Sequence, residues 1–433
     1  MDDIADDLLT EILLRIPIKS VFMCKCVSKR WLSLISDPFF PSSYTSLRGH
    51  NLTGHNWTLL TNHHNNITSH HNNLTWHEWS LIRSHRKFKS KNTKKYTGSN
   101  VTIKNHPDFL SPGFSLEFLP VEIPYPCGCC ILASSNGLLL CRGFIVEAGR
   151  AVYYVCNPLT KQCASLPASL PSIPNMYVQV GFISDDKGFK VVMISPDYTG
   201  NSDSLNYSVL SASYTCSELD EWKWRHVNSS ISPPHNVWFL EGNRPFVTYK
   251  GILHWQDKQN HRIIAYDTNT DTDHVVKLPT EKARHNQGLL GTCQGRLRYL
   301  EAAHDGIRSL CTWSVWSLLD YDGGIWEVEF RCSTAIQLPR DHVIWEKHLC
   351  LDELEDPLAW CRNTNTWPFL VLHPTKLDLV YIGLSNGWVI AYNIRTQRIE
   401  EKWHSKSHLS QVLFILPQWP TLIPPPPWGY VNN

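Results

Sequence analysis

The first forty residues carry apolar side chains at the spacing of a short helix. Leu8, Leu9 and Ile12 lie at intervals of one, three and four residues. Ile16 continues the series, which gives the stripe that a helix of 3.6 residues per turn presents to one side. Acidic residues crowd the start of the segment, where carboxylates meet the unpaired amides of a helix N-terminus. The pattern predicts a helix that ends just before Pro17, because proline has no backbone N–H to donate.

Two further short helices are predicted before Pro38. One runs from Ser20 to about Val27, and the next begins at Ser28, a favourable N-cap, and ends near Ser36. The three helices together carry more apolar surface than a segment of about forty residues can bury by itself. Either another protein or the downstream part of this chain must therefore cover the surface that is left over.

The region 109–417 shows a different pattern, in which short apolar runs alternate with Gly, Pro, Asn and Asp. This pattern is typical of an all-β domain. Several runs begin at glycines with repeated offsets: 137–181 and 251–295 are both separations of about 44 residues, and 295–383 is twice as long. A period of this length is that of a four-stranded propeller blade.

A second sequence motif recurs where strands are predicted to end. The sequence reads Asn/Asp-x-x-Thr at 157–160, 267–270 and 393–396. Asn and Asp side chains can bond their own backbone and reverse the chain, so each instance predicts a hairpin between the last strands of a blade. The predicted fold class is α+β multidomain: a small three-helix unit at 1–40, then an all-β propeller-like domain of six to eight blades at 109–417. A pair of β-sandwiches is the alternative.

Two further segments complete the predicted organisation. Residues 41–108 are His/Asn-rich and then basic, and we expect a partly ordered insertion with some strand content. The pairs at 63–64 and 70–71 could hold a transition metal, but a solvated loop is favoured because no Cys or carboxylate stands at a fixed spacing beside them. The basic run 83–95 could be a nuclear-import signal or a nucleic-acid contact, but a solvated charged loop is favoured. Residues 418–433 form a Pro-rich tail that we expect to be extended and disordered.

Charge and composition narrow the possible partners. A net charge of +1 argues against a dominant role in binding nucleic acid. The acidic N-terminus has no basic leader followed by an apolar core, and no apolar run approaches the roughly 18 residues that a membrane span needs. We therefore expect no membrane partner, a cytoplasmic or nuclear location, and reduced thiols among the 14 cysteines.

Motifs for catalysis are weak. Residues 383–387 satisfy G-x-S-x-G, but an apolar strand follows where a nucleophile elbow needs a helix. Residues 127–130 contain a C-x-x-C spacing without a second Cys or His pair at the distance of a zinc site. We predict no catalytic residue, no metal ion and no cofactor.

The N-terminal residues resemble a known motif. The runs 4–20, 25–31 and 35–40 are similar to the F-box of plant F-box proteins. In that family the motif docks on Skp1, the adaptor of cullin-based SCF ubiquitin ligases. The sequence departs from the family pattern at two places. Ile4-Ala5 stands in place of Leu-Pro, so a proline that pre-sets the turn before the helix is missing. Met23-Cys24 stands in place of Arg-Phe, so a small side chain replaces a large ring. By this resemblance, the residues at or just behind the Skp1 interface are Leu8, Leu9, Ile12, Ile16, Pro17, Val21, Val27 and Trp31.

The β region resembles the same family. The runs 134–141, 156–162, 251–255 and 324–326 are similar to the kelch-like F-box-associated region of plant F-box proteins, where the C-terminal domain is the substrate receptor. The resemblance implies a non-catalytic, substrate-recognition adaptor of an SCF-type E3 ubiquitin ligase. Its partners would be a Skp1-like adaptor, through it a cullin, and an unknown protein substrate. The alternatives are a Skp1-independent propeller binding module and a propeller-based enzyme.

Overall fold

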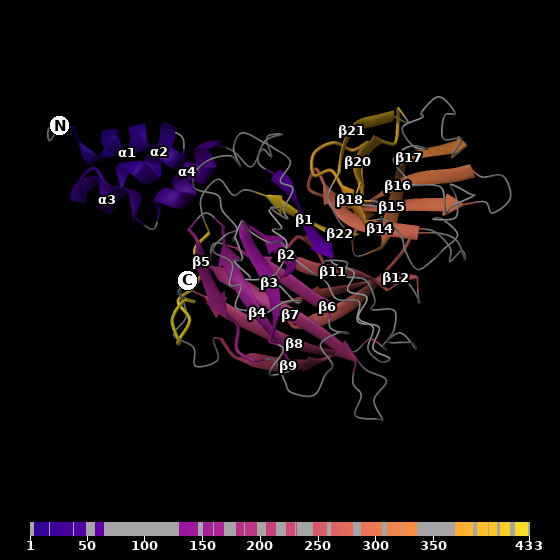
Figure 1. Cartoon of the computed structure of the whole chain (residues 1–433), viewed down its shortest axis with the longest axis horizontal. Helices are drawn as coiled ribbons and strands as arrows, with labels where there is room; N and C mark the ends of the chain where they lie inside the picture. The colour runs from indigo at the N-terminus through magenta and orange to yellow at the C-terminus, as the bar shows by residue number, and fades with distance from the viewer. Residues whose placement is uncertain are drawn as a thin grey trace, which may run out of the picture.

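Short helices precede a set of antiparallel sheets in the chain (Figure 1). The structure, a computed structural model, describes residues 4–48, 57–64, 130–145, 150–168, 179–196, 205–213, 222–231, 246–257, 261–279, 287–304, 310–335, 369–383, 388–404, 408–415 and 421–431, apart from positions 17, 38, 159, 186, 230, 322 and 397.

The N-terminal helices form a lobe with its own core. The helices are α1 (Asp6–Arg15), α2 (Ile18–Cys24), α3 (Lys29–Ile35) and α4 (Phe40–Arg48). The first three confirm the predicted helices, and Ser28 caps α3 as expected by accepting a bond from the Trp31 amide at 3.2 Å. The fourth was not predicted. It packs on α1 and adds Phe40 and Tyr44 to the lobe core, so the helical lobe continues past residue 40.

The β region contains five four-stranded antiparallel sheets within the described residues. The sheets are β2–β5 (Cys130–Ser135, Leu138–Ile145, Arg150–Asn157, Gln162–Ser165), β6–β9 (Gln179–Ser184, Gly188–Pro196, Leu205–Ser213, Trp224–Asn228), β10–β13 (Val247–Tyr249, Ile252–Asp257, Arg262–Asp267, Thr272–Lys277), β14–β17 (Gln287–Cys293, Arg296–His304, Leu310–Asp320, Ile325–Ala335) and β18–β21 (Phe369–Leu372, Leu379–Gly383, Trp388–Asn393, Arg398–His404). We call them blades 1 to 5.

The two ends of the β region meet in a two-stranded sheet. Strand β1 (Trp57–His64) pairs antiparallel with β22 (His408–Ile415), with Trp57 opposite Ile415. Each blade's first strand lies beside the first strand of the next blade, and β22 lies against both β18 and β2 (Figure 1). The small sheet therefore closes the ring between blade 5 and blade 1. It also accounts for the strand content expected in segment 41–108. The His70-His71 pair and the basic run 83–95 lie outside the described residues.

The described residues form five four-stranded blades, fewer than the six to eight predicted, and the remaining sheet of the ring has only the two strands β1 and β22. Gly137, Gly251 and Gly295 each occupy the turn between the first two strands of a blade, but Gly181 lies inside β6. The separation of Gly137 and Gly181 was therefore not a blade repeat. Loops of different length between strands make the true spacing uneven.

Two turn types recur on one face of the ring. Gly137, Gly251 and Gly295 have φ of 78°, 78° and 69°, each after a residue that also has positive φ. Such a pair is the tight reversal of a two-residue hairpin, and it favours glycine because a Cβ is strained there. The Asn/Asp-x-x-Thr prediction is confirmed: Asn157 Oδ1 accepts from the Thr160 amide at 3.1 Å, and the same arrangement recurs at the end of blade 5.

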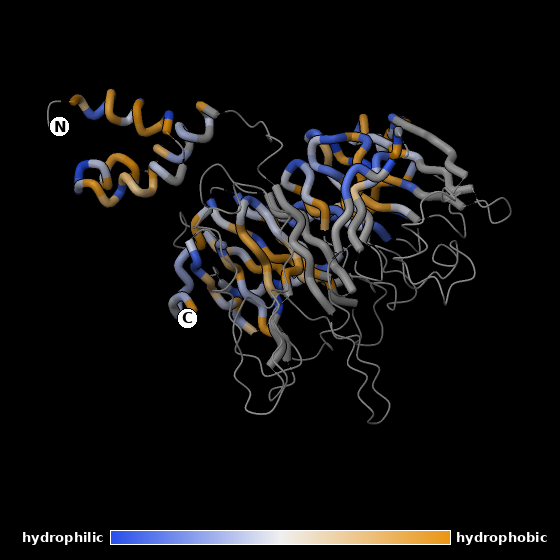
Figure 2. The backbone as a smooth tube through the Cα atoms, turned by 45° about the horizontal axis from the view of Figure 1, so that its top comes forward, coloured by the Kyte–Doolittle hydropathy of each residue, from blue (hydrophilic) through white to orange (hydrophobic). Residues whose placement is uncertain are grey.

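Apolar side chains fill the space between neighbouring blades, and Figure 2 shows the apolar positions along their strands. Indole groups add hydrogen bonds across these interfaces. Trp224 of blade 2 donates to the Pro167 carbonyl beyond blade 1 at 3.0 Å, and Trp326 of blade 4 donates to the Lys277 carbonyl of blade 3 at 2.9 Å. These two indoles therefore link neighbouring blades through their polar edge as well as through their apolar rings.

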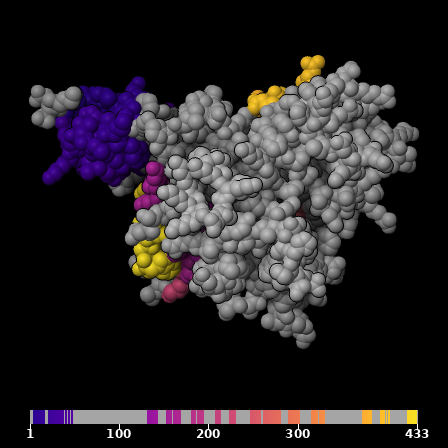
Figure 3. Space-filling model, viewed as in Figure 1, coloured from indigo at the N-terminus to yellow at the C-terminus, as the bar shows by residue number. Residues whose placement is uncertain are grey.

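The C-terminal tail is ordered, and the prediction of disorder is wrong for residues 421–431. The segment is extended, as expected, but it lies against blade 1, where Figure 3 shows it in yellow beside magenta residues. Its Ile423 is buried in the core shared by blades 1 and 2. A proline run has no apolar period to reveal such docking, which depends on a distant surface.

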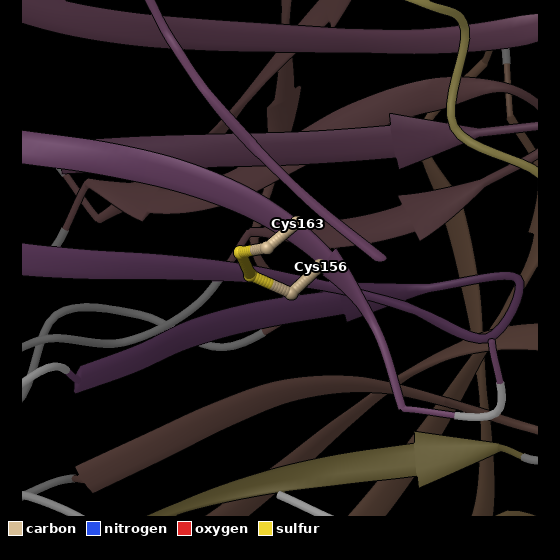
Figure 4. The surroundings of a disulfide bond; sticks show 2 residues. All are labelled: Cys156 and Cys163. Carbon is tan, nitrogen blue, oxygen red and sulfur yellow. A yellow bond between two sulfur atoms is a disulfide. The ribbon is translucent and has the colours of Figure 1, made fainter. Parts of the chain in front are cut away.

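A disulfide joins Cys156 on β4 to Cys163 on β5 (Figure 4). The two residues are direct register partners, with Cα atoms 4.2 Å apart, so their side chains start from adjacent positions on one face of the sheet. The expectation of reduced thiols therefore does not hold for this pair. Cys24 and Cys26 in the helical lobe are free thiols.

Candidate functional site

Helix α1 presents an apolar stripe to solvent. Leu8 and Ile12, four residues apart and so on one side of the helix, are 62 % and 49 % exposed. About 100° around the helix, Leu9 and Leu13 are 3 % and 0 % exposed in the lobe core. One short helix therefore buries one apolar side within the lobe and leaves the other uncovered.

The other predicted interface residues divide in the same way. Val27 follows α2 and is exposed, whereas Val21 is fully buried. Ile16 and Trp31 are half-buried and pack against the lobe core. Pro17 lies outside the described residues. The resemblance thus selected exposed residues together with the buried ones that hold them in place.

Polar contacts fix the start of α1 against α3. Arg30 Nε donates to Asp6 Oδ1 at 2.7 Å, and Arg30 Nη2 donates to the Ile4 carbonyl. Ala5 precedes α1 and supplies no side-chain cap, so these bonds and the acidic first turn stabilise the helix start instead. At the other end, the Tyr44 hydroxyl of α4 donates to the Ile16 carbonyl at 2.9 Å. Both ends of the stripe are therefore fastened to the lobe.

The structure adds exposed apolar residues that the predicted site omitted. Met23 of α2, Leu32 of α3 and Phe39 before α4 all have large exposed side chains. Spacing did not single out Leu32, because it lies three residues from the buried Ile35 and so near the same side of α3. Close to Met23, Lys25 lies 4.9 Å from the centre of the Phe22 ring, and partial burial lowers the pKa of its ammonium group.

The weak catalytic motifs gain no support in the described part of the chain. Gly383 ends β19, residues 384–387 lie outside the described residues, and β20 begins at Trp388, so a strand follows the G-x-S-x-G sequence where a nucleophile elbow needs a helix. No group of three or more His, Cys, Asp or Glu among the described residues is placed to hold a metal ion. No helix in the described ranges is long and apolar enough to cross a membrane.

Comparison with known families agrees with the arrangement of helices and blades. The F-box domain family matches residues 1–42, and the family described as F-box protein At3g26010-like, beta-propeller matches residues 79–418. The chain belongs to this F-box propeller family. Its relatives include the Arabidopsis thaliana F-box protein At1g30790, which is 24 % identical over 92 % of this chain and 89 % of its own length. F-box protein At5g49610, also from Arabidopsis thaliana, is 25 % identical over 92 % and 94 % of the two chains.

The F-box of this chain keeps its fold despite the two departures in its sequence. Cys24, where the family has a large ring, is half-buried and packs at the edge of the lobe core. Ala5 is exposed ahead of α1, where Arg30 contacts the neighbouring Asp6 and Ile4. The departures thus fall at the lobe's margin, and the stripe of Leu8 and Ile12 is unaffected by them.

Proposed function

We propose that this F-box protein is a substrate-recognition adaptor of an SCF-type E3 ubiquitin ligase. In this role the helical lobe binds a Skp1-like adaptor, and through it a cullin, while the propeller holds a target protein. The adaptor contributes position and no covalent chemistry. The observation that carries the proposal is the exposed stripe of Leu8 and Ile12 on a helix whose Leu9 and Leu13 are buried in the lobe core.

Covering the stripe of Leu8 and Ile12 with a partner would contribute a favourable free energy of binding. Covering a Leu or Ile side chain stabilises a complex by about 1.5–3 kcal/mol relative to leaving it in water. Leu8 and Ile12 lie on a helix that is fixed at both ends, so little ordering opposes binding. Exposed Val27 and Met23 add apolar area to the same small lobe. A partner with an apolar groove fits such a helix face.

The propeller supplies a separate, rigid receptor for the target. Its blades are joined by apolar cores and by hydrogen bonds between blades, including Lys190 Nζ of blade 2 to the Thr268 carbonyl of blade 3 at 2.8 Å. A rigid ring can present a target at a fixed place relative to the ligase components. The membership of both units in families of F-box proteins supports this division of roles.

Co-purification tests the proposal. Tagged full-length protein, expressed with a Skp1-like protein and a cullin, should recover both. Ile12→Asp should abolish recovery, because it places a charge where an apolar groove must close. Val275→Asp is the matched control, since Val275 is an exposed apolar residue on β13 in the propeller. Recovery of neither partner by the wild-type chain, or equal recovery by the Ile12→Asp chain, would overturn the proposal.

A further inference from the structure

The C-terminal segment 421–431 is fixed at its start to two turns of blade 1. Thr421 Oγ1 donates to the Asn136 carbonyl in the turn between β2 and β3. Asn157, at the turn between β4 and β5, donates from Nδ2 to the Thr421 carbonyl. The main chain and side chain of one residue are therefore both held by the body of the propeller.

The next residues enter a groove between blades 1 and 2. Ile423 is 1 % exposed and belongs to the core built from Leu140 and Val155 of blade 1 and Phe189 and Trp222 of blade 2. Pro424 and Pro426 are buried, whereas their neighbours Leu422 and Pro425 are exposed. An extended proline-rich chain with some side chains inserted and others exposed is the geometry by which such peptides dock in grooves.

A tryptophan anchors the far end of the segment. Trp428 Nε1 lies 3.2 Å from the Ser165 carbonyl oxygen and 3.1 Å from Ser165 Oγ, both possible acceptors on β5 of blade 1. Its ring meets Trp222 of blade 2 edge-to-face, with centroids 5.6 Å apart. One side chain thus contacts both walls of the groove.

The last described residues extend along the outer strand of blade 1. The Val431 amide donates to the Cys163 carbonyl of β5 at 2.8 Å. A turn with Gly429 at φ +82° precedes this contact, and the Tyr430 hydroxyl returns to the Ile423 carbonyl at 2.7 Å. The segment therefore pairs with an outer strand and also closes upon itself.

We propose that the groove between blades 1 and 2 is a peptide-binding site for a proline-rich segment flanked by an aliphatic and a tryptophan anchor, and that the chain's own C-terminal segment occupies it reversibly. The groove supplies the recognition chemistry: apolar walls for the Ile423 side chain, a carbonyl and a hydroxyl for an indole N–H, and the Cys163 carbonyl for a backbone amide. Prolines lower the ordering cost of an extended ligand. The inference is independent of the proposed ligase role.

Cleavage of the folded full-length protein tests the site. A protease recognition sequence inserted between Pro417 and Gln418 allows the C-terminal fragment to be cut free after folding. Size exclusion with mass spectrometry then measures whether the fragment stays bound. We expect it to remain bound, and to exchange with an excess of labelled synthetic peptide of residues 418–433. This arm needs no substitution in the groove.

Two variants of the fragment test the anchor. Trp428→Ala should raise the dissociation rate of the cleaved fragment about tenfold or more, because it removes both the ring contact with Trp222 and the indole N–H bond to Ser165, and tryptophan is a typical binding hot spot. Leu422→Ala is the control within the same segment, since its side chain is exposed, and it should leave the rate unchanged. Immediate loss of the wild-type fragment, retention without exchange, or an equal rate for Trp428→Ala would each overturn the proposal.

Discussion

The side chain of Asn157 donates a hydrogen bond from Nδ2 to the carbonyl of Thr421, a residue 264 positions later in the chain. The same side chain accepts a bond from the Thr160 amide through Oδ1 at 3.1 Å. Asn157 is fully buried, so both bonds are made away from water. One amide group therefore reverses the chain at the end of β4 and also holds the C-terminal segment on blade 1.

Replacing this asparagine should cost more stability than replacing its counterpart in blade 5. Asn157→Ala loses the turn bond and the tail bond and leaves buried groups unpaired, so the free energy of unfolding should fall by about 2–3 kcal/mol. Asn393→Ala is the comparison, because Asn393 accepts from the Arg395 and Thr396 amides and donates to Glu400 at a half-buried site that water can reach, and its loss should cost about 1 kcal/mol. Urea unfolding curves measure both. Equal losses would show that the tail bond contributes nothing.

Two glycines should respond to alanine for different reasons. At Gly251, φ is +78° and a Cβ would meet nothing within 4 Å. Gly251→Ala should therefore lower the free energy of unfolding only through the strain of a left-handed backbone, by about 1–2 kcal/mol. At Gly288, a Cβ would lie 1.8 Å from the Tyr299 hydroxyl oxygen. Gly288→Ala must push a buried ring aside and should cost about 3 kcal/mol or prevent folding. The yield of soluble protein and the unfolding midpoint distinguish the two, and a smaller loss at Gly288 than at Gly251 would contradict this explanation.

A buried histidine should make stability depend on pH. His254 Nδ1 lies 3.1 Å from the Ile252 carbonyl oxygen and 3.3 Å from that of Val247, and Nε2 lies 2.6 Å from the Tyr321 hydroxyl. The pKa of His254 is lowered from 6.5 to about 4, chiefly by burial and to a smaller degree by the nearby His274, against the opposing effect of the two carbonyls. The neutral imidazole is therefore the form that the fold accommodates.

The sign of the pH effect follows from this lowered pKa. Between pH 6.5 and 4 the unfolded chain binds a proton at this histidine that the folded chain does not, so stability falls as the pH falls through this window, by at most about 3 kcal/mol. His254→Gln should flatten this part of the profile, while His226→Gln, at an exposed position, should leave it unchanged. Denaturation midpoints at intervals of half a pH unit provide the measurement. Parallel profiles for the wild-type and His254→Gln chains would contradict the assignment.

The local patterns of this sequence predicted individual helices and hairpins better than they predicted which elements pack against each other. The spacing of Leu8, Leu9 and Ile12 was enough to predict α1, because a helix is specified by neighbours in sequence. The Asn/Asp-x-x-Thr hairpins were predictable for the same reason, since the polar side chain bonds its own turn. The helical lobe and the all-β region could thus be assigned from the order of residues alone.

Features that depend on distant residues were missed. Among the described side chains of helix α4, Phe40 and Tyr44 are the ones in the lobe core, and their burial depends on α1 rather than on a local stripe. The pairing of β1 with β22 joins the two ends of the β region. The docking of Ile423 needs a groove formed by blades 1 and 2. In each case the deciding contact lies far away in sequence, where periodicity carries no information.

The same limit applies to the candidate site. Resemblance selected Leu8, Leu9, Ile12 and Val21 together, but only a three-dimensional arrangement separates the exposed residues from the buried ones. This separation changes the choice of variants. A substitution at Leu9 or Leu13 would damage the lobe core, by about 2–5 kcal/mol for Leu→Ala, and would confuse folding with binding. Leu8 and Ile12 can be changed without removing core contacts.

Titration of a purified Skp1-like protein into the full-length chain by calorimetry tests the central claim most directly. The wild-type chain should give saturable binding with one partner per chain. The Leu8→Asp/Ile12→Asp double variant should lose about 100-fold or more in affinity, since two apolar contacts become desolvated charges, while its unfolding curve matches that of the wild type because both positions are exposed. Equal affinity for the wild-type and double-variant chains, or no heat of binding with the wild-type chain, would contradict the account.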